Sequence, residues 1–281
     1  MKNEKQYCKK KYFSVILRLI TFFFAVITFF TLLFIILYIL IRGIPHLKIS
    51  LFSWKYTTEN VSLLPALINT VIITLFALIV SVPLGISTAI YLTEYSRKNS
   101  KMVKIIRTAT QTLAGFPSIV YGLFGFMFFV IALRWGYSVL AGSLTVSFMI
   151  LPLIIRTSEE AILAVPKIYK EGSFALGAGK VSTVFLIILP AASPGIFAGI
   201  ILGIGRIVGE TAALVYSSGT VAQIPSSLMS SGRTLAVHMY SISSEGLYIN
   251  QASATAVVLL VLVAGINSFA GILAKKIGKN L

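Results

Sequence analysis

The sequence predicts an all-α polytopic membrane protein with six transmembrane helices and both termini in the cytoplasm. Its 281 residues are 57% hydrophobic and 11% charged, whereas soluble domains carry about a quarter charged residues. Six apolar runs reach the roughly 20 residues that a membrane-spanning helix needs. Most of the 24 Lys and Arg residues lie in alternate connecting stretches, which the positive-inside rule assigns to the cytoplasm. The net charge of +16 is therefore interpreted as topology and lipid contact, not as a nucleic-acid footprint.

The six predicted spans cover residues 14–41, 63–92, 109–133, 137–155, 190–216 and 252–274. Basic tails, residues 1–13 and 275–281, flank them. The first run is longer than the apolar core of a secretory signal and no small-residue cleavage site follows it, so it should remain as an anchor. It lacks interior charge, which predicts a peripheral, lipid-exposed helix. Residues 14–62 are therefore read as a first helix with its external loop, and residues 63–274 as the core.

The third predicted span carries a helix break near its start. Pro117 stands between Gly115 and Gly122, and proline in this setting breaks or kinks a helix. Backbone groups freed at such a break are tolerated in a membrane only where protein or a cavity satisfies them. These residues are therefore candidates for the wall of a translocation pathway, with a purely structural kink as the alternative.

The fifth predicted span combines small residues with two ionisable ones. Gly195, Gly199 and Gly203 recur every four residues, a spacing that lets helices approach closely, within this bundle or against a partner. Arg206 and Glu210 are four residues apart and are expected to form an ion pair on one helix face. Ionisable residues inside a membrane usually face a bundle interior or a water path. The alternative is a purely structural pair.

The longest predicted cytoplasmic loop, residues 156–190, contains a candidate docking helix. Glu171, Phe174, Ala175 and Ala178 should share one side of a short helix that Gly177 and Gly179 end. An exposed Phe on a short helix of small residues suits insertion into a groove of another protein. The alternative is a connecting loop in which Phe174 packs on its own bundle.

The sequence offers no enzyme chemistry. The run from Gly177 to Ser182 is not a phosphate-binding P-loop, because Phe174 and Val181 occupy positions that require Gly and Ser or Thr. The eight acidic residues include no Asp, and there is a single Cys, so neither a paired-carboxylate nor a redox site is expected. A lone His238 without companion ligands argues against a metal site. We expect no cofactor, and an energy source on another chain.

The 156–190 loop resembles the EAA loop of ABC-transporter permeases. In that family the pattern is EAA, three residues, Gly, nine residues and I-x-L-P. Glu171, Gly177, Ile187, Leu189 and Pro190 fall on it, while Gly172 and Ser173 stand where two alanines are usual. The resemblance implies an importer permease of the type I architecture whose loop docks on a separate ATPase. The implied coupling residues are Glu171, Gly172, Ser173, Phe174, Gly177, Leu189 and Pro190.

Other segments resemble the phosphate members of that family. They are residues 91–95, 115–122, 175–178, 189–196 and 206–212. The sequence Gly-Glu-Thr-Ala at 209–212, together with residues 233–240, resembles the PstA type more than the PstC type. The resemblance implies import of inorganic phosphate through a prokaryotic cell membrane. It also implies four partners: a second, PstC-type permease, two copies of an ATP-binding subunit and an extracellular phosphate-binding protein.

By the same resemblance, Arg206, Glu210 and Thr211 would lie on the translocation pathway. The planar guanidinium of arginine suits phosphate oxygens, and Glu210 would orient Arg206. Two alternatives remain at this point: a permease for another oxyanion such as sulfate or molybdate, or a membrane scaffold or signalling subunit without transport.

Overall fold

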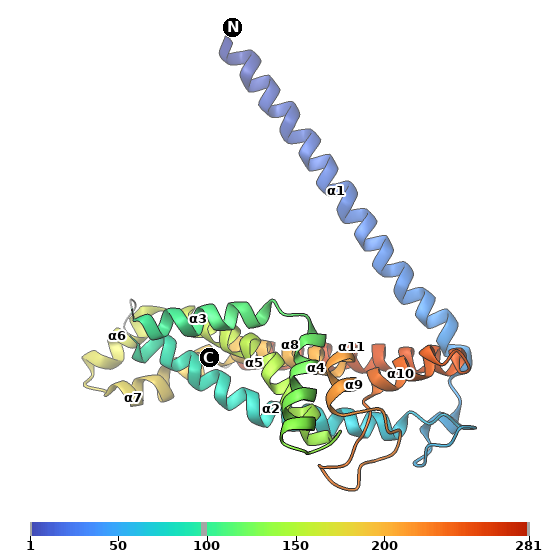
Figure 1. Cartoon of the computed structure of the whole chain (residues 1–281). Coiled ribbons are helices and arrows are strands. Elements are labelled where there is room, and N and C mark those ends of the chain that lie inside the picture. The colour runs from blue at the N-terminus through green and yellow to red at the C-terminus, as the bar shows by residue number, and fades with distance from the viewer. Residues whose placement is uncertain (1, 97–99, 280–281) are drawn as a thin grey trace.

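The computed structural model describes residues 2–96 and 100–279, with the backbone alone for residues 2–13, 270 and 273–279. Every regular element of this part of the chain is helical, which confirms the predicted all-α class (Figure 1). The α-helices are α1 (Lys2–Gly43), α2 (Leu64–Ile90), α3 (Lys101–Ala114), α4 (Ser118–Gly125), α5 (Val139–Leu163), α6 (Lys167–Ala175), α7 (Lys180–Thr183), α8 (Leu189–Val208), α9 (Ala212–Ser217), α10 (Leu235–Ser244) and α11 (Ile249–Lys279). The 3₁₀ turns η1 (Ile44–His46) and η2 (Ile49–Phe52) and the π-helical turns η3 (Tyr91–Tyr95), η4 (Phe126–Ala132) and η5 (Val184–Ile188) extend or link them.

Five of the described helical stretches are long and apolar enough to cross a membrane. They are Ser14–His46, Leu64–Tyr95, Val139–Leu163, Lys180–Val208 and Ile249–Phe269. A sixth span is formed if the bent pair Lys101–Ala114 and Ser118–Ala132 counts as one. All six predicted apolar runs thus lie mainly in helices, two of them with a break, and α5 continues eight residues past its predicted end at 155. The charge at Arg156 ends the apolar run but not the helix, because Ser158 and Ile162 remain buried in the protein.

The core of the bundle is built on α2, α5 and α8, with α11 along α8 (Figure 1). The glycine row of α8 faces α5. A Cβ added at Gly199 would lie 2.6 Å from the Cβ of Thr157, and one at Gly195 would lie 2.7 Å from the Cβ of Ala161. The prediction of close helix packing is confirmed, and the partner is a helix of the same chain.

Helix α1 stands away from the bundle and touches it near its C-terminal end (Figure 1). There a Cβ at Gly43 would lie 2.3 Å from the carbonyl oxygen of Ser253 in α11. None of its most apolar 18-residue window is buried, which agrees with the predicted peripheral helix. The helix begins at Lys2, so the backbone of the basic tail continues into it. The basic side chains of residues 1–13 and 273–281 lie outside the described residues, as do residues 97–99.

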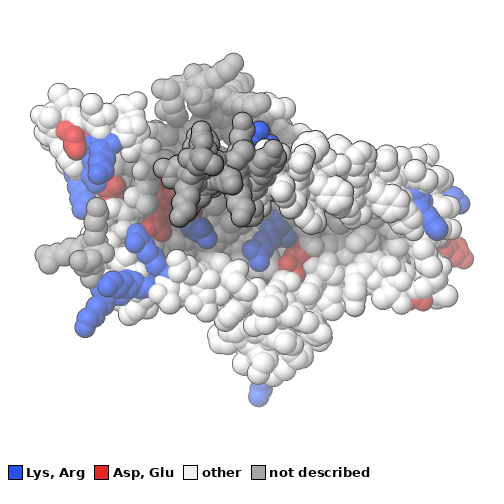
Figure 2. Space-filling model, turned by 90° about the horizontal axis from the view of Figure 1, so that it is seen from above, with Lys and Arg blue, Asp and Glu red and all other residues white. Residues whose placement is uncertain are grey.

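Charged side chains lie mainly toward one end of the bundle. In Figure 2 they gather toward the end that carries α6 and α7, and uncharged residues cover most of the long flank. The ion pairs among described side chains are Arg107–Glu159, Arg156–Glu160 and Lys170–Glu94. They involve α3, α5, α6 and η3, so all three belong to this end of the molecule. Below it is called the α6–α7 end, and the opposite end is called the α10 end.

Candidate functional site

Helix α8 stops at Val208, and a three-residue break separates it from α9. Glu210 lies in this break with its side chain buried, and its Oε1 accepts a hydrogen bond of 3.0 Å from the backbone N–H of Ala213. The carboxylate therefore caps the first turn of α9, where backbone N–H groups lack helical partners. The predicted continuous span over 190–216 is wrong at this point.

The predicted ion pair between Arg206 and Glu210 is also wrong. Neither residue takes part in the ion pairs that the described side chains form. The i,i+4 rule requires both residues in one helix, whereas α8 ends between them and Glu210 turns toward α9. Arg206 is exposed on the isolated chain. Its guanidinium is thus available for an external ligand, inside a segment that is otherwise apolar.

The break predicted at Gly115–Pro117 is confirmed. The axes of α3 and of α4 with η4 differ in direction by 103°. Pro117, with φ −58° and ψ 143°, directly precedes α4. Tyr121 holds the bend by donating a hydrogen bond of 2.7 Å from its hydroxyl to the carbonyl of Leu113 in α3. The carbonyl freed at the end of α3 is therefore satisfied within the protein, as a membrane environment requires.

The two broken regions meet in space. A Cβ at Gly122 of α4 would lie 2.8 Å from the Cα of Ala213 in α9, so only glycine permits this crossing. Ile119 of α4 lines the same cavity as Thr211 and Ala212. The structure therefore joins the helix-break residues to the residues around Glu210, although about 90 positions separate them in the chain.

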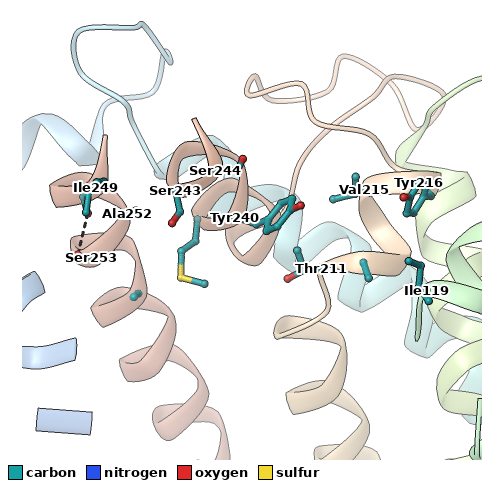
Figure 3. Close-up of a pocket in the computed structure, with 13 residues that line it drawn as sticks. Ile119, Thr211, Val215, Tyr216, Tyr240, Ser243, Ser244, Ile249, Ala252 and Ser253 are labelled. Carbon is teal, nitrogen blue, oxygen red and sulfur yellow. Dashed lines mark hydrogen bonds between the residues drawn. The ribbon is translucent and has the colours of Figure 1, made fainter. Parts of the chain in front are cut away.

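This cavity has a volume of about 690 Å³ and lies between α4, α9, α10 and α11 (Figure 3). Its polar side chains carry hydroxyl groups, and none of the described carboxylate side chains lines it. The hydroxyl-bearing residues are Thr211, Tyr216, Tyr240, Ser243, Ser244 and Ser253. In Figure 3 the side chains of Tyr240 and Thr211 extend toward the same space between α9 and α10. The sequence singled out only Thr211, because nothing local marks α10 as a wall.

The 156–190 loop forms a hairpin of α6, α7 and η5 at the α6–α7 end. No described residue of α6 is buried, and Phe174 is 41% exposed. Gly177 ends the turn with φ +82°, the left-handed conformation expected after a helix. Ala178 lies beyond the helix, so it does not share a helical face with Glu171 as predicted. A Cβ at Gly172 would meet nothing within 4 Å, so the position usually taken by alanine has room for one.

The remaining residues of the loop pattern continue this hairpin. Ser173 and Thr183 share a hydroxyl–hydroxyl hydrogen bond of 2.9 Å that joins α6 to α7. Leu189 and Pro190 begin α8 directly after η5. The loop residues thus lie together at one end of the bundle, apart from the α8–α9 break at the far end of α8.

Sequence reasoning missed a buried cationic cluster at the α10 end. Arg233, which no sequence pattern marked as buried, is only 5% exposed. Its guanidinium carbon lies 4.8 Å from the centre of the Tyr56 ring, which also contacts His238 edge-on. A cation over an aromatic face is stabilised electrostatically. The segment between α1 and α2 therefore packs Tyr56 against the start of α10 instead of running free over the surface.

His238 in this cluster should make the fold sensitive to acid. Burial, and then the Arg233 cation, lower the pKa of His238 from 6.5 to about 3. The folded protein keeps His238 neutral while the unfolded chain gains a proton below pH 6.5. Stability from this group is therefore complete above pH 6.5 and falls by up to about 1.4 kcal/mol per pH unit toward pH 3. Thermal unfolding of the purified full chain between pH 7.5 and 4.5 should show a flatter dependence for His238→Gln.

The matched control is His46→Gln, which removes the only other histidine. It should keep the dependence of the unchanged chain on pH. Equal slopes for His238→Gln and the unchanged chain would contradict the assignment.

Comparison with known proteins agrees with these features. Residues 81–279 match the family model described as "Binding-protein-dependent transport system inner membrane component". The chain is 34% identical over 230 residues to the probable ABC transporter permease protein YqgI of Bacillus subtilis (strain 168), covering 75% of this chain and 76% of that protein. It is 34% identical over 207 residues to the phosphate transport system permease protein PstA of Mycobacterium leprae (strain TN), covering 73% and 67%.

The fold also matches solved transporter structures. A chain of the MetNI methionine ABC transporter in an inward-facing conformation superposes with a TM-score of 0.60 at 18% identity, covering 85% of this chain and 96% of that one. A chain of a bacterial ABC transporter that imports alginate superposes with a TM-score of 0.58 at 15% identity, covering 89% and 95%. With the broken spans and the exposed loop hairpin, these matches show that the chain belongs to the family of binding-protein-dependent transport system inner membrane components and has the fold of a type I ABC importer permease.

Proposed function

We propose that this chain is the PstA-type membrane subunit of an ATP-driven importer of inorganic phosphate. The observation that carries the proposal is Arg206, an exposed cation outside any described ion pair, close in sequence to the break at Glu210 and Thr211. An anion leaving water needs positive charge and hydrogen-bond donors, and the guanidinium fork offers both to phosphate oxygens. Similarity to PstA proteins at 34–39% identity supports phosphate as the substrate.

The hydroxyl-lined cavity extends this site toward the α10 end. Thr211 belongs to both the break and the cavity wall. The hydroxyl groups of Thr211 and Tyr240 can donate to an anion, whereas those of Ser244 and Ser253 donate to backbone carbonyls. A wall without described carboxylates does not repel an anion. In this proposal phosphate passes the cavity and Arg206. Glu210 stabilises the break between α8 and α9 that leaves both accessible. Gly115, Pro117 and Gly122 form the second wall by setting α4 against α9.

In this proposal the loop hairpin is the site where the ATP-binding subunit docks and through which ATP hydrolysis is coupled to transport. The chain would work with a second, PstC-type permease, two copies of an ATP-binding subunit and an extracellular phosphate-binding protein, in a prokaryotic cell membrane with both termini cytoplasmic. Exposed apolar side chains on the hairpin support docking on the ATPase. They are Ile168, Tyr169, Phe174, Leu176 and Val181, exposed by 72%, 55%, 41%, 90% and 60%. Glu171 is exposed beside them.

Phe174→Asp should detach the ATP-binding subunit. An aspartate would place a charge in the docking groove, where burial of an unpaired carboxylate is costly. We expect at least about a tenfold loss of co-purified ATPase, since 1.4 kcal/mol corresponds to tenfold. The control is Phe52→Asp, because Phe52 is similarly exposed at 44% in η2 near the α10 end. Equal recovery of ATPase with both variants would contradict the docking role.

The proposal as a whole is tested by uptake of labelled phosphate into cells grown on scarce phosphate, with and without this chain. Removal of the chain should abolish high-affinity uptake, and excess sulfate should not compete. Competition by sulfate or molybdate would indicate another oxyanion. Unchanged phosphate uptake would reject the substrate, and failure to co-purify with any ATPase would favour a scaffold.

A further inference from the structure

At the α6–α7 end of the bundle, η3, which continues α2, contacts the loop hairpin through two side-chain interactions. Lys170 of α6 forms an ion pair with Glu94 of η3, although 76 positions separate them. The Lys180 ammonium, at the start of α7, lies 4.7 Å from the centre of the Tyr95 ring. Both arms of the hairpin therefore hold the same π-helical turn. No sequence pattern pointed to either contact.

The ion pair with Lys170 is more than a surface contact. The side chain of Glu94 is only 9% exposed, and that of Lys170 is 34% exposed. Pairs at fully exposed positions contribute little, whereas separation of a buried pair leaves a carboxylate without compensation. An apolar cluster of Ala89, Ile162, Val184 and Ile188 packs beneath this junction. The hairpin and the end of α2 therefore form one packed unit.

At the α10 end of the bundle, here called the outer end, α2 is hydrogen-bonded to the first residue of α10 and to the segment before it. Thr70 Oγ1 accepts a hydrogen bond of 2.8 Å from the backbone N–H of Leu235. Asn69 Nδ2 donates to the carbonyls of Gln223 at 3.2 Å and of Arg233 at 3.3 Å. Asn69 and Thr70 are fully buried, so water does not compete for these bonds. A shift of α2 along its axis must therefore move the start of α10, whose later residues Tyr240, Ser243 and Ser244 line the hydroxyl cavity.

Between these two attachments, from Thr70 to Glu94, α2 and η3 form one continuous helical stretch, about 36 Å long at 1.5 Å per residue. Helix α8 also connects the hairpin with the cavity, but it is interrupted after Val208. An unbroken helix transmits an axial displacement, while a break can absorb it. Of the two routes, α2 is the one whose helical course is unbroken, although Pro83 inside it lacks the N–H for one backbone hydrogen bond.

We propose that Glu94 and Lys170 are positioning residues that lock the ATPase-docking hairpin to α2, so that α2 carries the hairpin's movement to the segment 219–235 and the cavity. The proposal rests on the proposed function for the identity of the docked partner and the transported anion. Asn69 and Thr70 are the outer attachment of the same connection.

The test is a charge reversal in the assembled transporter, made with the partner permease, the ATP-binding subunit and the binding protein. Glu94→Lys should lower phosphate uptake at least about tenfold and remove the stimulation of ATP hydrolysis by loaded binding protein, because two cations then oppose each other. The ATPase should still co-purify, since the docking face of α6 is untouched. The double variant Glu94→Lys with Lys170→Glu should restore both readouts to within about threefold, the signature of a direct pair.

Glu160→Lys is the matched control. It reverses the same charge in the Arg156–Glu160 pair near the start of the same loop, where the two side chains are 71% and 64% exposed. This variant should leave uptake and stimulated hydrolysis unchanged.

The outer attachment is tested with Thr70→Val and Thr70→Ser. Valine removes the oxygen that accepts from Leu235 N–H, while serine keeps it. Thr70→Val should retain unstimulated ATP hydrolysis but lose coupling to the binding protein, and Thr70→Ser should retain both. A role in folding alone would instead lower the amount of assembled complex in step with both activities.

Three results separate the possibilities. Unchanged uptake and stimulation in Glu94→Lys, or no recovery in the double variant, would overturn the proposed lock. Normal coupling in Thr70→Val would overturn the outer attachment. It is also possible that the unchanged transporter imports no phosphate. If stimulated ATP hydrolysis is then lost in Glu94→Lys and recovered in the double variant, the lock would be supported and the phosphate assignment rejected.

Discussion

Replacing Arg206 with alanine is expected to abolish phosphate uptake while the transporter still assembles. The guanidinium is exposed and belongs to no ion pair among the described side chains, so its removal strands no partner charge inside the chain. Two hydrogen bonds from a charged donor are worth about 1.5 to 3 kcal/mol each, so their loss should slow transport by roughly 100-fold or more. Uptake of labelled phosphate and recovery of the complex would be measured together.

Arg206→Lys refines this test. Lysine keeps the charge but cannot present two parallel N–H groups to an oxyanion. We therefore expect partial uptake, between that of the alanine variant and the unchanged chain. The control is Arg156→Ala, which removes an arginine whose side chain is 71% exposed near the α6–α7 end. Normal uptake by Arg206→Ala would remove this residue from the pathway.

The structure changes the role of Glu210. The sequence assigned it to orient Arg206, but its carboxylate caps α9 through Ala213. Glu210 therefore stabilises the break between α8 and α9 after Val208. This arrangement leaves Arg206 unneutralised, which is the better condition for binding an anion, because a paired guanidinium would have to exchange its carboxylate for the substrate.

Local signals in the sequence predicted the elements well. Long apolar runs located the spans, Pro117 between glycines located the bend, and the glycine spacing of α8 predicted close packing. Each of these depends on the chemistry of a few neighbouring residues. The break after Val208 was missed because the i,i+4 rule was applied as if the helix continued, although Gly209 stood at the point where it ends.

Contacts between segments that are distant in the chain could not be predicted from the sequence. Nothing near Glu94 indicates that Lys170 lies against it, since 76 positions intervene. Nothing in the sequence near Arg233 indicates that it is buried, yet Tyr56, from the segment between α1 and α2, covers its guanidinium. In both cases burial is decided by the packing of other elements, and a single sequence carries no record of that packing.

The glycine row supplies the second large effect, because Gly199→Ala should destabilise the bundle. The added Cβ would lie 2.0 Å from Oγ1 and 2.6 Å from Cβ of Thr157, so α8 and α5 must separate. Overpacking of this kind costs about 1–3 kcal/mol, sometimes more, and we expect a lower temperature of thermal unfolding and reduced abundance in the membrane. Gly205→Ala on the same helix is the control. Its Cβ would make only an ordinary contact of 3.8 Å with Asn267.

These two variants separate packing from helix propensity. Alanine favours a helix over glycine by roughly 0.5–1 kcal/mol, so Gly205→Ala should be neutral or stabilising while Gly199→Ala is destabilising. Moving the small residue to the other helix, as Gly199→Ala with Thr157→Gly, should recover part of the loss by removing the clashing side chain. Equal stability of the two single variants would mean that α5 and α8 do not approach as closely as the glycine row requires. Because the loop hairpin continues directly into α8, its position relative to α5 would then have to depend on other contacts.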